Sequence, residues 1–143
     1  MPYRYLEDIA AADVAFEATG QTIEDLFMAA AAATLHVMID NPQALEPRQK
    51  RILEAADESL DILLFQFLQE IIYYKDAQQL LLQVSQIRID AETTGYRLRA
   101  EALGEPIDPA RHEMIVDVKA VTLHRLSVQQ KKEGWVAVVV LDI

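Results

Sequence analysis

The clearest hydrophobic pattern lies at the carboxyl end of the chain. A turn-like stretch, residues 131–134, is followed by residues 135–141, which are apolar without alternation and rich in valine. A short continuous apolar run after a turn is typical of a strand that is buried on both faces. The chain then ends on Asp142 and Ile143, so we expect a carboxyl end that is held inside a sheet instead of frayed.

Helical spacing of apolar residues begins after Thr22 and continues to Met38, before Asn41 and Pro42 end it. Thr22 can accept a hydrogen bond at the start of this helix. Asp25 follows three residues later, as in a capping box with Asp in place of Glu. The pattern therefore predicts a first helix with one apolar face.

A second helical stretch begins near Leu60, with Asp57 or Ser59 as the capping residue. Its apolar residues continue to Ile72 and cover much of the girth of the helix. A helix of this kind is buried against two surfaces. We therefore place the second helix at the centre of the fold, under a sheet.

Period-two alternation and turn signals predict the remaining strands. These strands are expected at residues 3–6, 13–20, 80–89 with a bulge near Ser85, 96–102 and 116–128. Residues 46–56 fit either an exposed strand or the start of a helix, and we favour the strand. Residues 104–109 should form a loop, because two prolines three residues apart interrupt a strand ladder. The result is an α+β fold in one domain, residues 1–143, with two helices packed on a mostly antiparallel sheet of about six or seven strands.

The amino-acid composition excludes several kinds of functional site and disfavours some partners. The chain has no cysteine, which excludes disulfides, thiolate zinc sites and cysteine nucleophiles and fits a reducing cytoplasm. Its net charge is −10 and its thirteen basic residues are scattered, so direct binding of nucleic acid is disfavoured. No signal peptide is visible, and the alanine-rich run 28–33 is too short to span a membrane. We therefore expect a cytoplasmic protein whose acidity attracts cations or a basic partner.

The histidines and common motifs offer little support for catalysis. His36, His112 and His124 are not spaced as a metal-binding pair, and the sequence contains no phosphate-binding glycine loop and no nucleophile elbow. His36 suits the negative end of the first helix. His112 is either a polar loop residue or a functional donor.

The carboxylates near the predicted strand ends suggest a more specific function, the binding of a cation. Asp142 and the α-carboxylate of Ile143 would bring two negative charges to one place, which costs free energy unless a cation, a basic side chain or a helix amino end lies nearby. The alternative is that both groups point into water. Asp13, at the start of a predicted strand, is either a turn residue or a ligand. Spacing alone does not pair Asp13 with Asp142, but if the three groups meet, their oxygens suit calcium or magnesium.

The chain resembles the archease family over nearly its whole length. The resemblance rests on these motifs: Tyr5-Leu6, Ala12-Asp13-Val14, Gly20-x-Thr22-Ile-Glu24, Val37-Met38, Glu58-Ser59-Leu60, Leu63-Leu64, Gly104-Glu-Pro-Ile-Asp-Pro-x-Arg-His112, Val118-Lys-Ala-Val-Thr-Leu-His124 and Leu141-Asp142-Ile143. One departure is clear. The family usually has His-Thr-Ala-Asp where this chain has Ala10-Ala-Ala-Asp13, so the chain looks like a divergent branch that lacks this histidine.

The resemblance implies an accessory protein and not an enzyme. Archeases assist the RtcB-type RNA ligase of transfer-RNA splicing and RNA repair, promote its guanylylation and allow repeated turnover. They have also been regarded as chaperone-like modulators of RNA-processing enzymes. The family's metal site, usually assigned to calcium, matches Asp13, Asp142 and Ile143. Lys119 matches a family lysine implicated in partner contact, and His112 is a second candidate for such contact.

Two other functions are compatible with the same residues. The same carboxylates could activate water in a small metal-dependent hydrolase, although no histidine or other base is placed beside them in the sequence. A general chaperone or scaffold would need no metal at all.

Overall fold

The computed structural model describes residues 2–7 and 13–143. Within these residues the chain forms two α-helices, one short 3-10 helix and eight strands. In chain order they are β1 (Tyr3–Leu6), β2 (Asp13–Gly20), α1 (Ile23–Met38), η1 (Pro42–Ala44), β3 (Gln49–Asp57), α2 (Leu60–Gln78), β4 (Leu80–Glu92), β5 (Gly95–Pro106), β6 (Ala120–Val121), β7 (Ser127–Lys131) and β8 (Gly134–Asp142).

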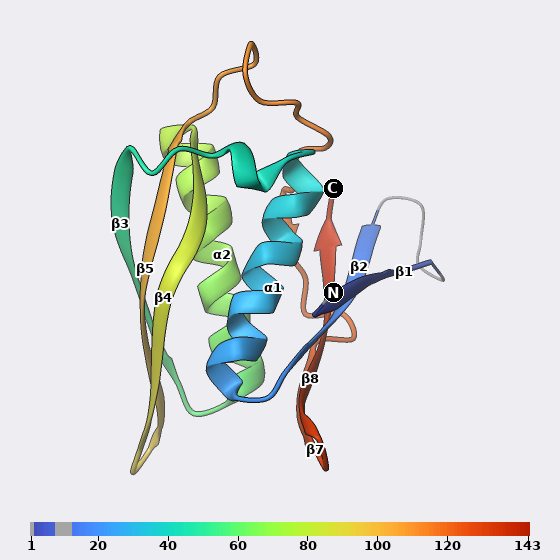
Figure 1. The fold of residues 1–143 in the computed structure, drawn as a ribbon. Coiled ribbons are helices and arrows are strands. Elements are labelled where there is room, and N and C mark those ends of the chain that lie inside the picture. The colour runs from blue at the N-terminus through green and yellow to red at the C-terminus, as the bar shows by residue number, and fades with distance from the viewer. Residues whose placement is uncertain (1, 8–12) are drawn as a thin grey trace.

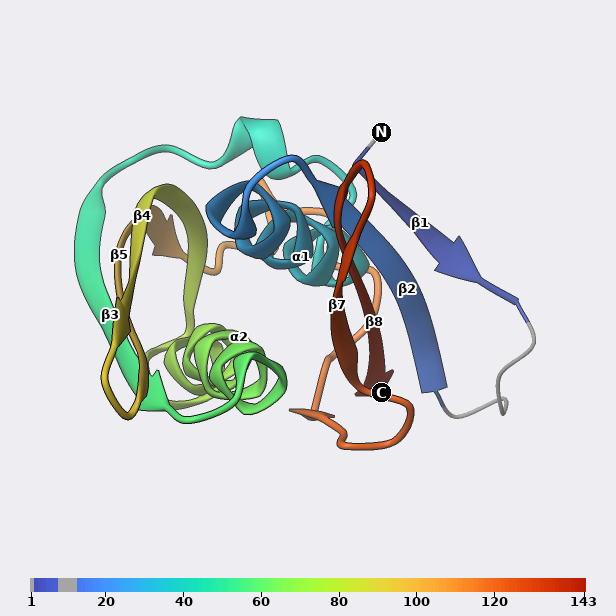
Figure 2. The same cartoon turned by 90° about the horizontal axis from the view of Figure 1, so that it is seen from below.

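The two helices lie between two antiparallel sheets, as Figures 1 and 2 show. One sheet has the order β3-β5-β4. The other has the order β1-β2-β8-β6, and β7 also pairs with β8. Helix α1 contacts β2 and β8 on one side and β4 on the other, whereas α2 contacts β3, β4 and β5 and also reaches β6 and β7. Both helices therefore bury apolar surface on two sides. This was predicted for α2, whereas only one apolar face was expected for α1, because the small alanines of its second buried side give a weak hydrophobic signal.

Local sequence signals set the starts of both helices. The Thr22 hydroxyl accepts a hydrogen bond from the N–H of Asp25 at 3.0 Å, and the Ser59 hydroxyl accepts one from the N–H of Ile62 at 3.2 Å. These bonds satisfy helix amides that have no partner within the helix. Ser59 is thus the cap of α2, while the Asp57 carboxylate accepts a bond from the N–H of Ser59.

The core fills the space between the helices and the sheets. Phe27 of α1 stacks on Phe67 of α2 with ring centroids 5.8 Å apart, and both side chains are fully buried. The alanines of α1 at positions 29, 30, 31 and 33 are also buried. Small side chains on this helix let both sheets approach its backbone closely. In the part of the chain that the structure describes, neither helix combines the length and apolarity needed to cross a membrane.

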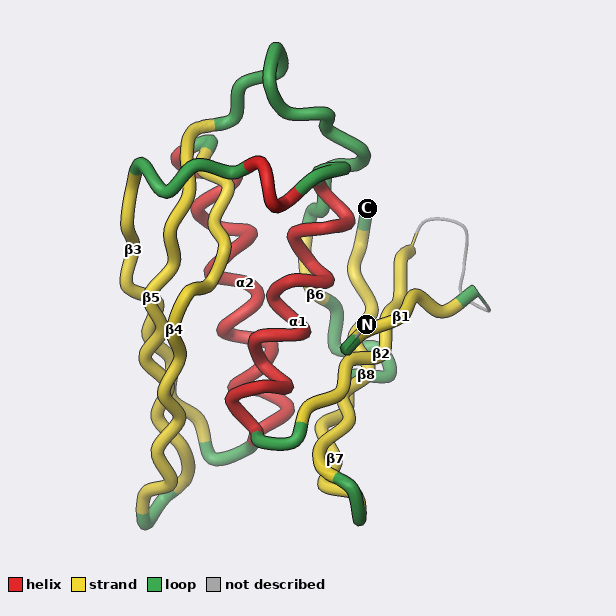
Figure 3. The backbone as a smooth tube through the Cα atoms, viewed as in Figure 1, coloured by secondary structure: helices red, strands yellow, loops and turns green. Residues whose placement is uncertain are grey.

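The α+β class, the two helices and the antiparallel pairing predicted from the sequence are confirmed. Strands β1 and β2 have the predicted bounds, and the register of β4 against β5 shifts between Val84 and Gln86, where a bulge was expected. The strands are divided between two sheets, however, a separation that the hydrophobic pattern did not reveal (Figure 3).

The prediction of a loop throughout residues 104–109 was wrong at its start. Strand β5 continues to Pro106, with Gly104 opposite Gln49 on β3 and Leu82 on β4, and with Pro106 opposite Leu80. Pro106 is tolerated because it is the last residue of the strand, where the loss of one N–H donor interrupts little of the ladder.

The prediction of one continuous strand at residues 116–128 was also wrong. Only Ala120–Val121 and the later Ser127–Lys131 pair with β8. Side chains of α2 replace part of the missing ladder. Gln69 accepts a bond from the N–H of Val121, Asp61 accepts one from the N–H of Val128, and Lys75 donates to the carbonyl of Val118. Valine-rich alternation does not distinguish these backbone partners from a neighbouring strand.

Candidate functional site

Asp13 and Asp142 lie opposite each other on neighbouring strands. Strand β2 begins at Asp13, β8 ends at Asp142, and the antiparallel register makes these two residues direct partners. Directly opposed residues of an antiparallel pair have Cα atoms about 4.5–5.5 Å apart. The two carboxylates, which come from opposite ends of the sequence, therefore share one end of the sheet.

Both side chains also lie on the same face of that sheet. Phe16 of β2 and Val139 and Leu141 of β8 belong to the core between the layers. Side chains alternate along a strand, so Asp13 and Asp142 face away from this core, and each is only partly buried. The carboxylates are thus adjacent and reachable from solvent.

Asp142 is also held on its other side. Ala120 of β6 is its direct partner there, and the N–H of Lys119 donates to the carbonyl oxygen of Asp142 at 2.8 Å. The expected strand at the carboxyl end is confirmed, with Asp142 between two neighbouring strands. Lys119, the predicted partner-contact lysine, has an exposed side chain immediately beside this end of β8.

The arrangement suits a hard cation. Like charges directly opposite each other on a sheet destabilise it, by an amount on the order of 0.2–1 kcal/mol. A divalent ion between Asp13 and Asp142 would reverse that cost, and the half-buried Ile143 follows directly and would bring a third carboxylate. Carboxylate oxygens without nitrogen or sulfur donors fit calcium or magnesium. No group of three or more His, Cys, Asp or Glu side chains is close enough to hold a metal in residues 2–7 and 13–143. A cation bound by Asp13 and Asp142 would therefore need the α-carboxylate or water as further ligands. Ala10, the position at which the family resemblance led us to expect a histidine, lies outside the described residues.

His112 sits in a different environment from Lys119. Only 2% of its side chain is exposed. Its Nδ1 accepts a bond from the N–H of Asp108 at 2.8 Å, and its Nε2 lies 3.6 Å from a carboxylate oxygen of Glu105. This ring fixes the loop that follows β5, and its surface is not available to a partner while the loop keeps this conformation.

Glu105 is the centre of that loop cluster. Burial opposes its ionisation, but the N–H of Glu46 at 2.5 Å and the guanidinium of Arg111 at 2.5 Å both stabilise the carboxylate. With His112 beside it as well, the pKa of Glu105 is held below its ordinary value of 4.5. These hydrogen bonds and the ion pair therefore anchor the loop that leads toward Lys119, and they stabilise the fold.

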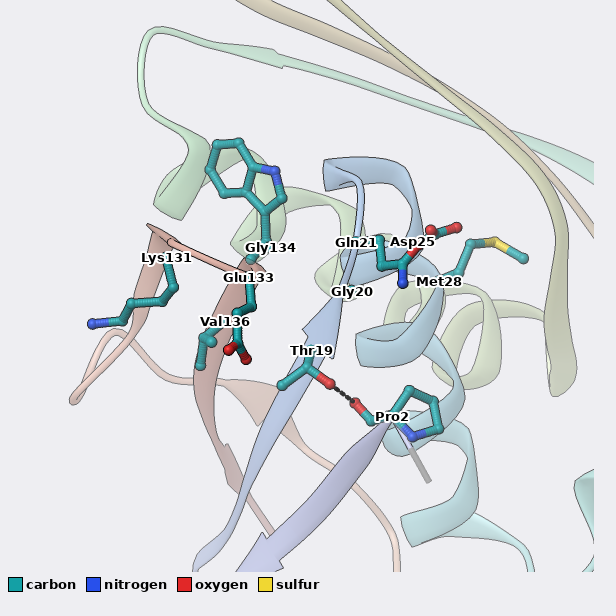
Figure 4. A pocket seen from close by; sticks show the side chains of 11 residues that line it. Pro2, Thr19, Gly20, Gln21, Asp25, Met28, Lys131, Glu133, Gly134 and Val136 are labelled. Atoms are coloured by element: carbon teal, nitrogen blue, oxygen red, sulfur yellow. Dashed lines mark hydrogen bonds between the residues drawn. The ribbon is translucent and has the colours of Figure 1, made fainter.

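A pocket lies at the opposite end of β2 and β8 from Asp13 and Asp142. It has a volume of about 830 Å³ and is lined by Pro2, Thr19, Gly20, Gln21, Asp25, Met28, Lys131, Glu133, Gly134, Trp135 and Val136 (Figure 4). Gly20 is the register partner of Trp135, at the far end of the ladder from Asp13 and Asp142. We still take the paired carboxylates as the candidate site, because they offer ligands for a cation and the pocket is distinguished only by its volume. This pocket was not predictable from the sequence, because its lining comes from separate segments of the chain.

Comparisons with known proteins agree with the fold. A sequence model of the archease protein family matches residues 3–143. The protein archease of Thermococcus gammatolerans is 36% identical over 133 residues, which cover 92% of this chain and 93% of that protein. The protein archease of Methanopyrus kandleri is 35% identical over 143 residues, the full length of both chains.

Solved structures of similar proteins have the same fold. The solution structure of protein 1598 from Methanobacterium thermoautotrophicum superposes with a TM-score of 0.85 at 29% identity and covers 99% of each chain. The crystal structure of an archease, a possible chaperone, from Thermotoga maritima shares the fold with a TM-score of 0.64 at 19% identity, covering 96% of this chain and 97% of that one. The family match, the full-length relatives and the shared two-sheet architecture together show that this chain belongs to the archease family.

Proposed function

We propose that this archease is an accessory protein of an RtcB-type RNA ligase. In this role Asp13, Asp142 and the α-carboxylate of Ile143 hold one divalent cation, calcium in the first instance. The observation that carries the proposal is the register of β2 against β8, which sets Asp13 directly opposite Asp142. Two carboxylates so placed repel each other, and a cation between them would relieve that repulsion.

A bound cation would supply a fixed positive charge at the acidic end of the sheet that carries Asp13 and Asp142, here called the tip. Asp13 and Asp142 would orient it from two neighbouring strands, and the pairing of Asp142 with Ala120 would keep that carboxylate in place. Sites built on paired strands position ligands more firmly than sites on loops do. The tip would therefore present a defined geometry to the ligase.

The surroundings of this tip support docking to a protein. Lys119 is exposed beside Asp142, and Leu123 is 61% exposed just after Thr122, whose N–H donates to the carbonyl of Val140 on β8. An exposed apolar side chain next to charged groups is a common feature of protein interfaces. The net charge of −10 favours a basic partner, such as an enzyme that handles RNA, over RNA itself.

The roles of two histidines favour an accessory protein over an enzyme. His112 is buried in the loop cluster, and Nδ1 of His36 lies 3.1 Å from the hydroxyl of Tyr3, which occupies that nitrogen. Neither is positioned as a general base for the paired carboxylates. A chain without cysteine also fits action in the cytoplasm.

Ligase guanylylation provides the test. The wild-type protein, Asp142→Ala and Glu133→Ala would each be added to the RtcB-type ligase with GTP and calcium. Glu133 is an exposed acid at the far end of β8, so its variant controls for loss of charge. We expect stimulation by the wild type and by Glu133→Ala but not by Asp142→Ala. Equal stimulation by all three proteins would overturn the proposal.

Two further assays separate the remaining alternatives. Turnover of phosphoesters by this protein alone, with magnesium or manganese, would indicate a hydrolase instead. Addition of one residue after Ile143 removes the α-carboxylate from its position. We expect that extension to abolish ligase stimulation, whereas a scaffold that acts without the metal would keep it.

A further inference from the structure

We infer that Gln69 of α2 is a positioning residue for the carboxylates at the end of β8, an inference that rests on the proposed cation site. Among the described residues, the Gln69 side chain forms no hydrogen bond with Asp13 or Asp142. It acts through the short segment 117–122, which lies between α2 and β8. The side chain holds this segment in place, and the segment in turn holds Asp142.

The segment needs such support because its own pairing is short. Strand β6 is two residues long, Ala120–Val121, and it pairs with Asp142 and Leu141 at the very end of β8. Two additional bonds extend this contact, from the N–H of Lys119 to Asp142 at 2.8 Å and from the N–H of Thr122 to Val140 at 3.0 Å. A pairing this short at a chain end frays unless something else fixes it.

Helix α2 supplies the fixation from the opposite side. The side-chain oxygen of Gln69 accepts a bond from the N–H of Val121 at 2.8 Å. Lys75, which is 3% exposed, donates to the carbonyl of Val118 at 2.7 Å and also forms an ion pair with Asp117. Backbone groups of this segment therefore bond alternately to α2 and to β8, so the segment ties the helix to the site.

Gln69 is the better member of this pair to test. Loss of Lys75 would remove a buried charge and an ion pair together, which endangers folding. Gln69→Met keeps the length of the side chain but removes the acceptor, so the N–H of Val121 loses its partner. Gln69→Glu keeps an acceptor at the same place and serves as the conservative rescue.

Asp61→Ala is the matched control. Asp61 lies on the same helix, and its carboxylate accepts a bond from the N–H of Val128 at 2.8 Å. Val128 is the partner of Ala137, well away from Asp142 along β8. This variant thus removes the same kind of bond from the same stretch of chain without touching the part that pairs with Asp142.

The experiment measures amide hydrogen exchange at Lys119 and Thr122 together with calcium affinity by titration calorimetry. We expect Gln69→Met to speed exchange at both amides roughly tenfold and to weaken calcium binding by about tenfold, the lower end of the range for residues that orient metal ligands. Gln69→Glu and Asp61→Ala should stay close to wild type in both measurements.

Two results would overturn the inference: unchanged exchange at Lys119 in Gln69→Met, or an equal effect of Asp61→Ala, which would point to a general loss of stability. If the wild-type protein binds no calcium, the proposed cation site fails. The exchange rates alone then decide whether Gln69 positions the end of β8, so the two failures are distinguishable.

Discussion

Asp13 and Asp142 are direct register partners in an antiparallel pair, with both side chains on the face that points away from the helices. Folding of this archease therefore brings two like charges together at one end of a sheet. Such a pair lowers stability when it is alone and raises ligand affinity when a cation separates the charges.

Asp142→Asn should separate these two effects. Without divalent ions the variant should be as stable as the wild type, or more stable by about 0.2–1 kcal/mol, because the repulsion from Asp13 is relieved. Calcium should raise the melting temperature of the wild type but not that of the variant. Thermal unfolding with a chelator and then with millimolar calcium measures both effects. Glu133→Gln is the control, and a calcium response that persists in Asp142→Asn contradicts the site.

Leu123→Asp should weaken docking without weakening the fold. Leu123 is exposed beside the strand that pairs with Asp142, so the change should alter the free energy of unfolding by no more than about 0.5 kcal/mol. If a partner covers this side chain, its loss should reduce affinity for the ligase roughly tenfold or more. Binding to the immobilised ligase measures this effect. Unchanged affinity would place the interface elsewhere.

Glu105→Gln should remove one source of pH dependence. Hydrogen bonds and Arg111 hold the pKa of Glu105 below 4.5 in the folded protein. A depressed pKa contributes stability that is present above pH 4.5 and is lost as the pH falls through the folded value. The wild type should therefore be more stable than the variant at neutral pH, and the difference should shrink below pH 4.5.

Urea unfolding at a series of pH values checks that prediction. Glu113→Gln, an exposed carboxylate on the same loop, is the matched control and should show no such convergence. A stability difference between the wild type and Glu105→Gln that stays constant down to pH 3 would contradict the assignment.

Gly104→Ala should destabilise the sheet formed by β3, β5 and β4. A Cβ atom on Gly104 would lie against the carbonyl oxygen of Leu81, far inside van der Waals contact, and the obstacle is backbone that cannot rotate away. Overpacking of this kind costs about 1–3 kcal/mol or more. Chemical denaturation measures the loss, and a variant as stable as the wild type would show that the strands can separate locally at low cost.

Local features of the structure were predictable because their causes are local. Thr22 and Ser59 cap helices through bonds to residues three positions away, and the bulge near Ser85 changes the phase of the apolar pattern. The strand that ends at Asp142 was evident from its uninterrupted apolar run, which is rich in valine. Each of these signals lies within about a dozen residues of sequence.

The pairing of Asp13 with Asp142 was not predictable from residues alone. Register between the two ends of a chain depends on how all the intervening elements pack, so only resemblance to a family linked the two carboxylates. The role of Gln69 was missed for a similar reason. A glutamine on a helix face gives no sign that it will replace a strand as the partner of Val121.

The alanines of α1 have a consequence for the whole molecule. Because this helix touches β2 and β8 on one side and β4 on the other, its narrow side chains set the thickness of the sandwich. Ala30 and Ala33 are fully buried, so a larger residue at either position would push the helix away from the layer it faces; because the opposite side of the helix is packed too, the shift would reach the second sheet. Variation at these positions is therefore coupled across the full width of the protein.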